Sequence, residues 1–211
     1  KNKNTIFCLG PRYVLLNEQI NKYHNLNKIK RDKITNVLIT MGGSDKENLT
    51  PKVLDALKYF KEIEFNIVIG PAIKNKQKIK EILNNNNPNY KIIEDSNSLS
   101  ESMYNADLAI STGGLTSFEL SAIGTPFIGI SAAIWEEKRL KKMEEYGICK
   151  YLGNFDEFKH ENLYNIFKDL INNKKVRELM SNNGKKLLDG DGTNRIIKII
   201  REKIKDGNKT N

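Results

Sequence analysis

From Asn36 onward the chain alternates short runs of β-branched residues with longer amphipathic stretches, and this alternation restricts the possible folds more than any other feature. The strands of a parallel sheet are covered on both faces, so they appear in the sequence as short apolar runs. Helices with one apolar face separate these runs. Runs of strand length occupy residues 36–41, 65–69, 90–93, 107–111, 126–130 and 149–152, and helices are expected near 50–60, 75–84, 99–105, 115–123 and 136–146. The order predicts an α/β protein with a Rossmann-like, doubly wound parallel sheet. Ligands of such sheets bind at the carboxyl ends of the strands.

The chain divides into three parts. Residues 1–35 are polar and rich in lysine, with Thr5–Leu9 as their one strand-like stretch, and are expected to be a linker or arm from an N-terminal domain absent from this chain. Residues 36–172 form the predicted nucleotide-binding domain. Residues 173–211 are predicted to be helices that pack back on this domain or its partner, because apolar residues recur there at helical spacing. The first residue is Lys1 rather than Met, so we expect a fragment or a processed chain.

Composition narrows the functional classes. No apolar run reaches the roughly 18 residues that a membrane span needs, and no signal segment opens the chain, so a soluble cytoplasmic protein is expected. Cys8 and Cys149 lack the spacing of a metal or redox pair and are read as structural thiols. The net charge of +9 comes from lysines scattered among Asn, Ile and Glu, without an arginine-rich block, so nucleic-acid binding is disfavoured.

The first candidate ligand site is the glycine turn Gly42-Gly43-Ser44-Asp45, which directly follows a predicted strand and precedes a helix expected to begin near Thr50 and Pro51. Glycines let the backbone turn sharply and approach a ligand closely, and the amides of the turn and of the following helix favour a phosphate. A tight strand-to-helix turn without a ligand explains the same residues. The turn matches neither the GxGxxG nor the Walker pattern, so NAD and ATP have no specific support.

A second glycine turn, Ser111–Glu119, follows the strand at 107–111 and opens the helix that carries Glu119. Thr116 or Ser117 is expected to cap the first turn of this helix. A carboxylate one turn further on can accept two hydrogen bonds from a ribose cis-diol. The alternative for Glu119 is a favourable negative charge near a helix N-terminus.

The two glycine turns, together with Leu9–Leu16, Asn48–Thr50 and Asp189–Arg195, resemble the C-terminal half of the UDP-sugar hydrolase of pseudaminic acid biosynthesis. They are similar, more distantly, to the C-terminal domain of the N-acetylglucosaminyltransferase that makes the peptidoglycan lipid precursor. The resemblance covers nearly the whole chain. It implies a GT-B architecture, in which two Rossmann-like domains hold the nucleotide in the cleft between them, and release of UDP from a di-N-acetylated trideoxy sugar.

The resemblance also implies roles for individual residues. The diphosphate would lie by the first glycine turn, at Gly42, Gly43 and Ser44. The phosphates and ribose would lie by the second turn, at Gly113, Gly114, Leu115 and Thr116. Glu119 would bind the ribose hydroxyls, and the uracil would lie at the end of a strand, by Ile93 and Glu94. The family's catalytic histidine belongs to the N-terminal domain, and neither His24 nor His160 matches it. No catalytic residue is therefore expected in this chain, which alone should bind nucleotide but turn over poorly or not at all.

This sequence departs from the family at Trp135 and Glu136, where the family has an Asn-Gln pair, so a sugar or phosphate contact is expected to be lost or replaced. Three alternatives remain open: a GT-B glycosyltransferase that uses a UDP-sugar donor, a noncatalytic nucleotide-sugar-binding module, and a basic nucleic-acid binder. No cofactor is expected. No metal is expected either, because the only Asp-x-Asp sequence, at Asp189 and Asp191, lies in a predicted helix-capping turn.

Overall fold

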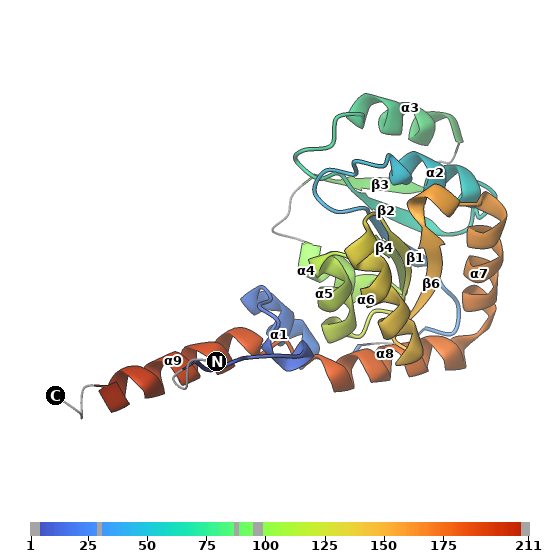
Figure 1. Cartoon of the computed structure of the whole chain (residues 1–211). Helices are drawn as coiled ribbons and strands as arrows, with labels where there is room; N and C mark the ends of the chain where they lie inside the picture. The colour runs from blue at the N-terminus through green and yellow to red at the C-terminus, as the bar shows by residue number, and fades with distance from the viewer. Residues whose placement is uncertain (1–4, 29–30, 87–88, 95–98, 208–211) are drawn as a thin grey trace.

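The computed structural model describes residues 5–28, 31–86, 89–94 and 99–207. At its centre is a six-stranded sheet in which every neighbouring pair is parallel, with the strand order β3-β2-β1-β4-β5-β6 (Figure 1). The strands are β1 (Asn36–Thr40), β2 (Glu64–Val68), β3 (Tyr90–Ile93), β4 (Leu108–Thr112), β5 (Phe127–Ser131) and β6 (Cys149–Asn154). All six strands predicted for the sheet are confirmed, and so is its doubly wound parallel arrangement.

Helices cover both faces of the sheet. They are α2 (Leu49–Leu57), α3 (Lys76–Asn86), α4 (Leu99–Asn105), α5 (Leu115–Ile123), α6 (Ile134–Glu145), α7 (His160–Asn172) and α8 (Lys174–Leu187), with a short 3₁₀ turn, η3 (Phe155–Glu157), before α7. Apolar residues of α2, α3 and α7 pack with Val37 and Ile39 on one face. Those of α4, α5 and α6 pack with Leu38 and Ala109 on the other. The alternation of side chains along each strand thus supplies two cores.

The strand order reverses direction at β1, which pairs with β2 on one side and with β4 on the other. The connections that leave β1 and β4 therefore run to opposite faces of the sheet, and a crevice opens between the carboxyl ends of these two strands. Open α/β sheets bind their ligands at such a topological switch point. Both glycine turns of the sequence lie here, because Gly42 follows β1 and Gly113 follows β4.

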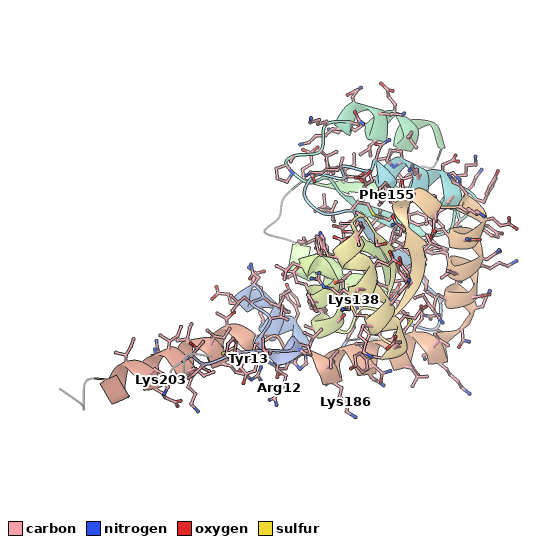
Figure 2. The ribbon with its side chains drawn as sticks, viewed as in Figure 1. Arg12, Tyr13, Lys138, Phe155, Lys186 and Lys203 are labelled. Carbon is pink, nitrogen blue, oxygen red and sulfur yellow. The ribbon has the colours of Figure 1, made fainter. Side chains whose placement is uncertain are left out.

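The N-terminal segment and the last helix lie side by side. A 3₁₀ turn, η1 (Pro11–Tyr13), contacts the last helix, α9 (Gly192–Gly207), which projects away from the sheet (Figure 1). Arg12 and Tyr13 lie beside the first turns of α9, and Lys203 lies near its outer end (Figure 2). The Arg195 guanidinium donates to the carbonyl of Arg12 at 3.0 Å and to the Asp189 carboxylate at 2.8 Å. These contacts anchor only the inner end of α9.

The predicted strand at Thr5–Leu9 is wrong, because these residues form no strand. Ile6, Phe7 and Leu9 are exposed, and an isolated extended segment has no neighbouring backbone to complete its hydrogen bonds. The polar stretch that follows contains a helix, α1 (Glu18–His24), packed against α4 and α5 with Ile20 fully buried. His24, which does not match the family's catalytic histidine, is half-buried with Nδ1 2.8 Å from the Ala122 carbonyl oxygen.

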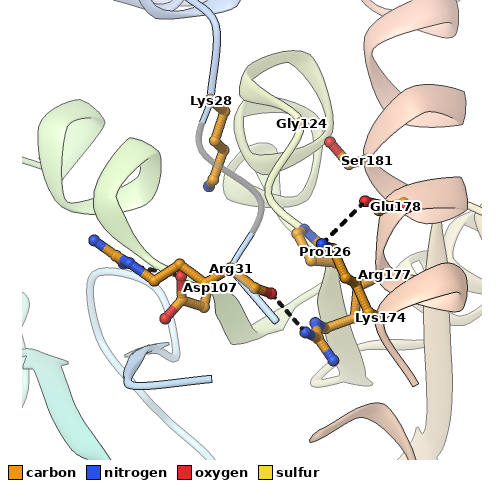
Figure 3. A pocket seen from close by; sticks show the side chains of 9 residues that line it. All are labelled: Lys28, Arg31, Asp107, Gly124, Pro126, Lys174, Arg177, Glu178 and Ser181. Carbon is orange, nitrogen blue, oxygen red and sulfur yellow. Dashed lines mark hydrogen bonds and ion pairs between the residues drawn. The ribbon is translucent and has the colours of Figure 1, made fainter. Parts of the chain in front are cut away.

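Charged side chains fasten the amino-terminal edge of the sheet, opposite the crevice. Asp107 accepts hydrogen bonds from the amides of Thr35 and Asn36 at 2.9 and 3.0 Å and from Arg31 at 3.0 Å. The Arg177 guanidinium of α8 donates to four backbone carbonyls, two at the end of α7 and two at residues 31 and 32, over 2.6–2.9 Å. Figure 3 shows the hydrogen bond to Arg31. The network joins α8 to the segment that leads into β1.

A half-buried lysine, Lys28, completes this edge. The Lys28 ammonium donates to Thr125 Oγ1 at 2.5 Å and to the Met103 carbonyl at 3.2 Å, and burial lowers its pKa to about 7. The cavity between Lys28, Asp107 and Arg177 measures only about 20 Å³, which is the space of a single water molecule. We therefore assign this cluster to the packing of the fold.

Candidate functional site

A cleft of about 570 Å³ opens at the switch point, a size within the range of small-molecule sites. Three turns line it: the one after β1, the one after β4 and the one after β5, with residues 41–47, 49, 112, 114–116, 132–133 and 135–136 on its walls. Six of the ten residues predicted to bind a ligand lie together there, namely Gly42, Gly43, Ser44, Gly114, Leu115 and Thr116.

The turn after β1 is fixed by its own backbone. Gly42 has a φ of +73°, a conformation that favours glycine. The Gly43 carbonyl accepts the Ala72 amide at 3.1 Å, and a Cβ on Gly70 would come within 2.4 Å of the same carbonyl oxygen. The turn after β2 thus braces the turn after β1.

Asp45 closes the N-terminus of α2. Its carboxylate accepts the amides of Leu49 at 2.7 Å and Thr50 at 3.0 Å. The expectation that the helix after the first glycine turn offers its amides to a phosphate is therefore wrong for these two amides, because the protein's own carboxylate occupies them. Gly42, Gly43 and Ser44 contribute backbone and one hydroxyl to the cleft wall, without a helix terminus behind them.

The turn after β4 presents an open helix terminus. The N-cap of α5 is Gly114, and no side chain caps this end of the helix. The predicted cap from Thr116 or Ser117 is wrong, because the Ser117 hydroxyl donates instead to the Gly114 carbonyl at 2.7 Å. The first amides of a helix have no intrahelical acceptor, so those of Leu115 and Thr116 are available at the cleft wall.

Gly113 lies behind this turn rather than in the cleft wall. A Cβ at this position would come within 2.7 Å of the Glu136 Cβ and 3.0 Å of the Leu140 Cγ. Its amide donates to Glu136 Oε2 at 3.1 Å, and its carbonyl accepts the Arg139 guanidinium at 2.5 Å. Gly113 therefore serves the site by letting α6 approach β4 closely.

The turn after β5 brings a carboxylate into the cleft. Glu136, in the first turn of α6, is only 6% exposed and lines the cleft. Its Oε2 atom accepts the Ala132 amide at 2.9 Å in addition to that of Gly113. The sequence singled out this position only as a departure from the family pattern. Glu136 and Glu137 look alike in the sequence, and only the packing of α6 on β4 distinguishes them.

The remaining predicted residues lie outside the lining of this cleft. Glu119 is half-buried on α5, and burial raises the pKa of its carboxyl. Among the described residues it has neither a hydrogen-bond partner nor an ion-pair partner. Ile93 and Glu94 lie at the end of β3, which β2 and β1 separate from β4 by about 14 Å at ordinary strand spacing. The Ile93 carbonyl accepts the Ile69 amide at 2.9 Å, and Glu94 pairs with Lys80 at 3.1 Å.

The described ranges hold neither a metal-ligand cluster nor a membrane-spanning helix. No cluster of three or more His, Cys, Asp or Glu side chains is arranged to hold a metal ion there. In the same ranges, no helix combines the length and the apolar character that crossing a membrane requires.

Comparison with known proteins identifies relatives of this arrangement. Residues 36–196 match the family described as Glycosyltransferase family 28 C-terminal domain. The chain is 27% identical over 202 residues to the spore coat polysaccharide biosynthesis protein SpsG of Bacillus subtilis (strain 168), covering 94% of this chain and 59% of SpsG. It is 31% identical over 140 residues to the UDP-N-acetylglucosamine--N-acetylmuramyl-(pentapeptide) pyrophosphoryl-undecaprenol N-acetylglucosamine transferase of Rickettsia bellii (strain RML369-C), covering 64% of this chain and 39% of the transferase.

Among solved structures, MurG of Acinetobacter baumannii superposes with a TM-score of 0.68 at 19% identity, over 84% of this chain and 55% of MurG. At this identity the likeness is one of fold, and it confirms the Rossmann-like domain expected for the C-terminal half of a GT-B protein. The chain spans between about two fifths and three fifths of the length of these relatives.

Proposed function

Because this chain belongs to the glycosyltransferase family 28 C-terminal domain family, we propose that it is the UDP-sugar-binding half of a two-domain enzyme that releases UDP from an activated sugar. The observation that carries the proposal is the uncapped N-terminus of α5, which opens on a glycine-lined cleft at the switch point of the sheet. The name of the Rickettsia relative includes UDP-N-acetylglucosamine and supports a uridine nucleotide.

The diphosphate is proposed to bind at α5. Three helices begin near the cleft, but Asp45 occupies the first amides of α2, and Glu136 places a negative charge at the start of α6. The amides of Leu115 and Thr116 are left to bind an anion, and the positive end of the α5 dipole favours it. The backbone of Gly42 and Gly43 and the Ser44 hydroxyl would contact the phosphates from the opposite wall.

The nucleoside is proposed to extend from α5 toward β3. Glu119 is a half-buried carboxylate without a partner among the described residues, and a ribose cis-diol would supply two hydrogen-bond donors to it. The uracil would lie near Ile93 and Glu94, where backbone groups at the end of β3 can read its edge. This placement requires the Lys80 side chain to leave or share Glu94, with which it pairs at the surface.

Catalysis in this proposal is hydrolysis. Water attacks the anomeric carbon, the glycosidic C–O bond to the diphosphate breaks, and UDP leaves. Amides at the α5 terminus stabilise the charge that develops on the departing diphosphate. The base that takes the proton of the water would come from an N-terminal domain, as the resemblance to the pseudaminic acid pathway hydrolase implies, and the sugar would be its di-N-acetylated trideoxy substrate.

A glycosyltransferase is the second candidate, and the name of the Rickettsia relative favours it. The nucleotide site would be the same, and an acceptor hydroxyl would replace water. A noncatalytic nucleotide-sugar-binding module would use this site without chemistry. An assay of the protein joined to its N-terminal domain separates these activities, because only the hydrolase releases UDP from the sugar nucleotide in the absence of an acceptor.

The proposal includes that N-terminal domain. Apolar side chains are exposed on the projecting helix α9 and on the segment beside it, including Ile197, Ile200 and Ile204 on the helix and Ile6 and Phe7 on the segment. Such residues are ordinarily buried against a partner. The relatives, which are longer than this chain, support an additional domain as that partner.

Calorimetric titration of the chain with UDP, UMP, ADP and CMP tests the nucleotide site. We expect saturable binding selective for UDP, weakened about tenfold or more by Glu119→Ala, since a carboxylate with two ribose hydrogen bonds contributes more than 1.4 kcal/mol. Glu161→Ala is the matched control, because Glu161 is an exposed glutamate in the first turn of α7, on another part of the domain. A folded chain that binds no uridine nucleotide would contradict the proposal.

A further inference from the structure

The backbone of Gly113, behind the turn after β4, is held by two side chains of one helix. Its amide donates to Glu136 Oε2 at 3.1 Å, and its carbonyl accepts the Arg139 guanidinium at 2.5 Å. Glu136 and Arg139 are three residues apart on α6, so they project from the same face of that helix. Both peptide units that flank Gly113 are therefore fixed by α6.

The carbonyl of Gly113 and the amide of Gly114 belong to one peptide unit. The bond between them is trans, so the carbonyl and the N–H point in opposite directions. The carbonyl points to Arg139, which does not line the cleft, whereas Gly114 does. The Gly114 amide consequently faces the cleft beside the first amides of α5, and no described residue accepts a hydrogen bond from it.

Two aromatic rings hold the guanidinium at this carbonyl. Its central carbon lies 4.7 Å from the centre of the Phe118 ring on α5 and 5.1 Å from that of the Trp135 ring on α6. Arg139 is half-buried, and no carboxylate in the described ranges lies within ion-pairing distance of it. Cation–π attraction to both rings keeps the side chain in place. A positive charge that no ion pair neutralises thus lies behind the N-terminus of α5.

We propose that Arg139 is a positioning residue of the diphosphate site, keeping the Gly114 amide turned toward the cleft by holding the Gly113 carbonyl. That amide adds a third donor to those of Leu115 and Thr116. This inference rests on the proposed function and adds a residue that does not itself contact the nucleotide. Successive amides form an anion-binding concavity, and donors already held in place bind a phosphate without first being ordered. Loss of the guanidinium would release this peptide unit.

Calorimetric titration with UDP tests this assignment on the 211-residue chain. Arg139→Met keeps an unbranched apolar side chain between the rings but cannot donate to the Gly113 carbonyl. We expect it to weaken UDP binding by about tenfold or more, because a hydrogen bond from a charged donor is stronger than a neutral one. Arg139→Lys restores a cationic donor and should recover the Kd to within about threefold of the unmodified chain.

Lys138→Met is the matched control. Lys138 is the adjacent residue on α6, is exposed to solvent and does not line the cleft. This variant removes the same charge one residue away, so it separates the hydrogen bond from the long-range attraction of a cation for a diphosphate. It should change the Kd for UDP by less than about twofold, because solvent and salt screen an exposed charge.

The amide resonance of Gly114 reports on the peptide unit directly. A donor on a carbonyl polarises the peptide group to which that carbonyl belongs. In nitrogen–proton correlation spectra of the labelled chain without ligand, Arg139→Met should therefore move the Gly114 resonance, and Lys138→Met should leave it in place. Melting temperatures measured without ligand show which variants are folded. Arg139→Gln, with a shorter, uncharged side chain, replaces Arg139→Met if the latter does not fold.

The outcomes separate the two proposals. Binding of UDP that Arg139→Met leaves unchanged, that Arg139→Lys does not recover, or that Lys138→Met weakens equally overturns the role of Arg139 and leaves the nucleotide site standing. Failure of the unmodified chain to bind UDP overturns both. Weaker binding by the folded Arg139→Met variant, with recovery in Arg139→Lys and a shifted Gly114 resonance, supports the assignment.

Discussion

The amide of Leu49 donates to the Asp45 carboxylate at 2.7 Å, so the helix after the first glycine turn is capped by the turn itself. Asp45→Ala removes this acceptor and the one for Thr50, and N-terminal caps contribute about 1 kcal/mol. We expect the free energy of unfolding to fall by about 1–2 kcal/mol in urea denaturation. Asp45→Asn should cost less, because asparagine tolerates the positive φ of +40° and retains one acceptor. Equal losses in the two variants would contradict the cap.

The glycines of the cleft should separate stability from binding. Gly113→Ala places a Cβ within 2.7 Å of the Glu136 Cβ, so it should destabilise the fold by about 1–3 kcal/mol. Gly43→Ala meets no protein atom within 4 Å and should leave the melting temperature nearly unchanged. The same substitution should weaken UDP binding about tenfold if the phosphates approach the backbone there. Melting curves and calorimetry on both variants check this, and unchanged UDP binding by Gly43→Ala would remove Gly43 from the site.

Arg177 should be one of the most sensitive positions of the fold. Its guanidinium is buried and donates to four backbone carbonyls. Arg177→Met removes all four hydrogen bonds and leaves buried acceptors without a donor, which should cost about 3–5 kcal/mol in chemical denaturation. Lys175→Met, two residues earlier on the exposed side of α8, serves as the control and should change stability by less than about 0.5 kcal/mol.

Lys28 should make stability depend on pH above neutrality. Burial lowers its pKa to about 7 in the folded chain, whereas an unfolded lysine titrates near 10.5. Between these values the unfolded state binds more protons, so the free energy of unfolding should rise with pH, by at most about 1.4 kcal/mol per pH unit from this group. Below pH 7 both states are protonated and the slope from this group disappears.

Urea denaturation at pH 7, 8 and 9 measures this slope as the difference between the unmodified chain and Lys28→Met. Lys22→Met removes an exposed lysine of α1 and should show the full slope of the unmodified chain. A slope that survives in Lys28→Met would assign the pH dependence to another group.

The spacing of apolar residues was sufficient to predict most of the fold, because each strand of this sheet is a short apolar run and each covering helix has one apolar face. The prediction at Thr5–Leu9 was wrong for a related reason: local apolar character is necessary for a strand, but a neighbouring strand must also be within reach. The turns at Gly42 and Gly114 were found because glycine marks sharp turns after strands. Their meeting in one cleft follows from the strand order, with β1 and β4 side by side.

The side-chain contacts of the cleft were harder to predict from the sequence than the fold. The carboxylates of Asp45 and Glu136 decide which helix termini stay open, and both act through contacts made only once the chain is folded. Glu136 stands in a run of charged residues on α6 that resembles an ordinary solvated helix face. The predicted cap by Ser117 was wrong because the Ser117 hydroxyl donates a hydrogen bond to the Gly114 carbonyl and does not accept one from the helix amides. Tertiary contacts, rather than the local sequence pattern, determine which hydrogen-bond partner each of these side chains takes.

The contact between the turns at Gly43 and Gly70 has a consequence for the thermodynamics of ligand binding. Because the backbone after β1 is already held in shape by the backbone after β2, a ligand that docks on it gains its contacts without first ordering a loop. Preorganisation of this kind raises affinity by reducing the entropy lost on association. A bulkier residue at Gly70 would push the two turns apart and leave the turn after β1 less ordered. The cleft would then bind its ligand more weakly, although Gly70 itself lies behind this turn and does not line the cleft.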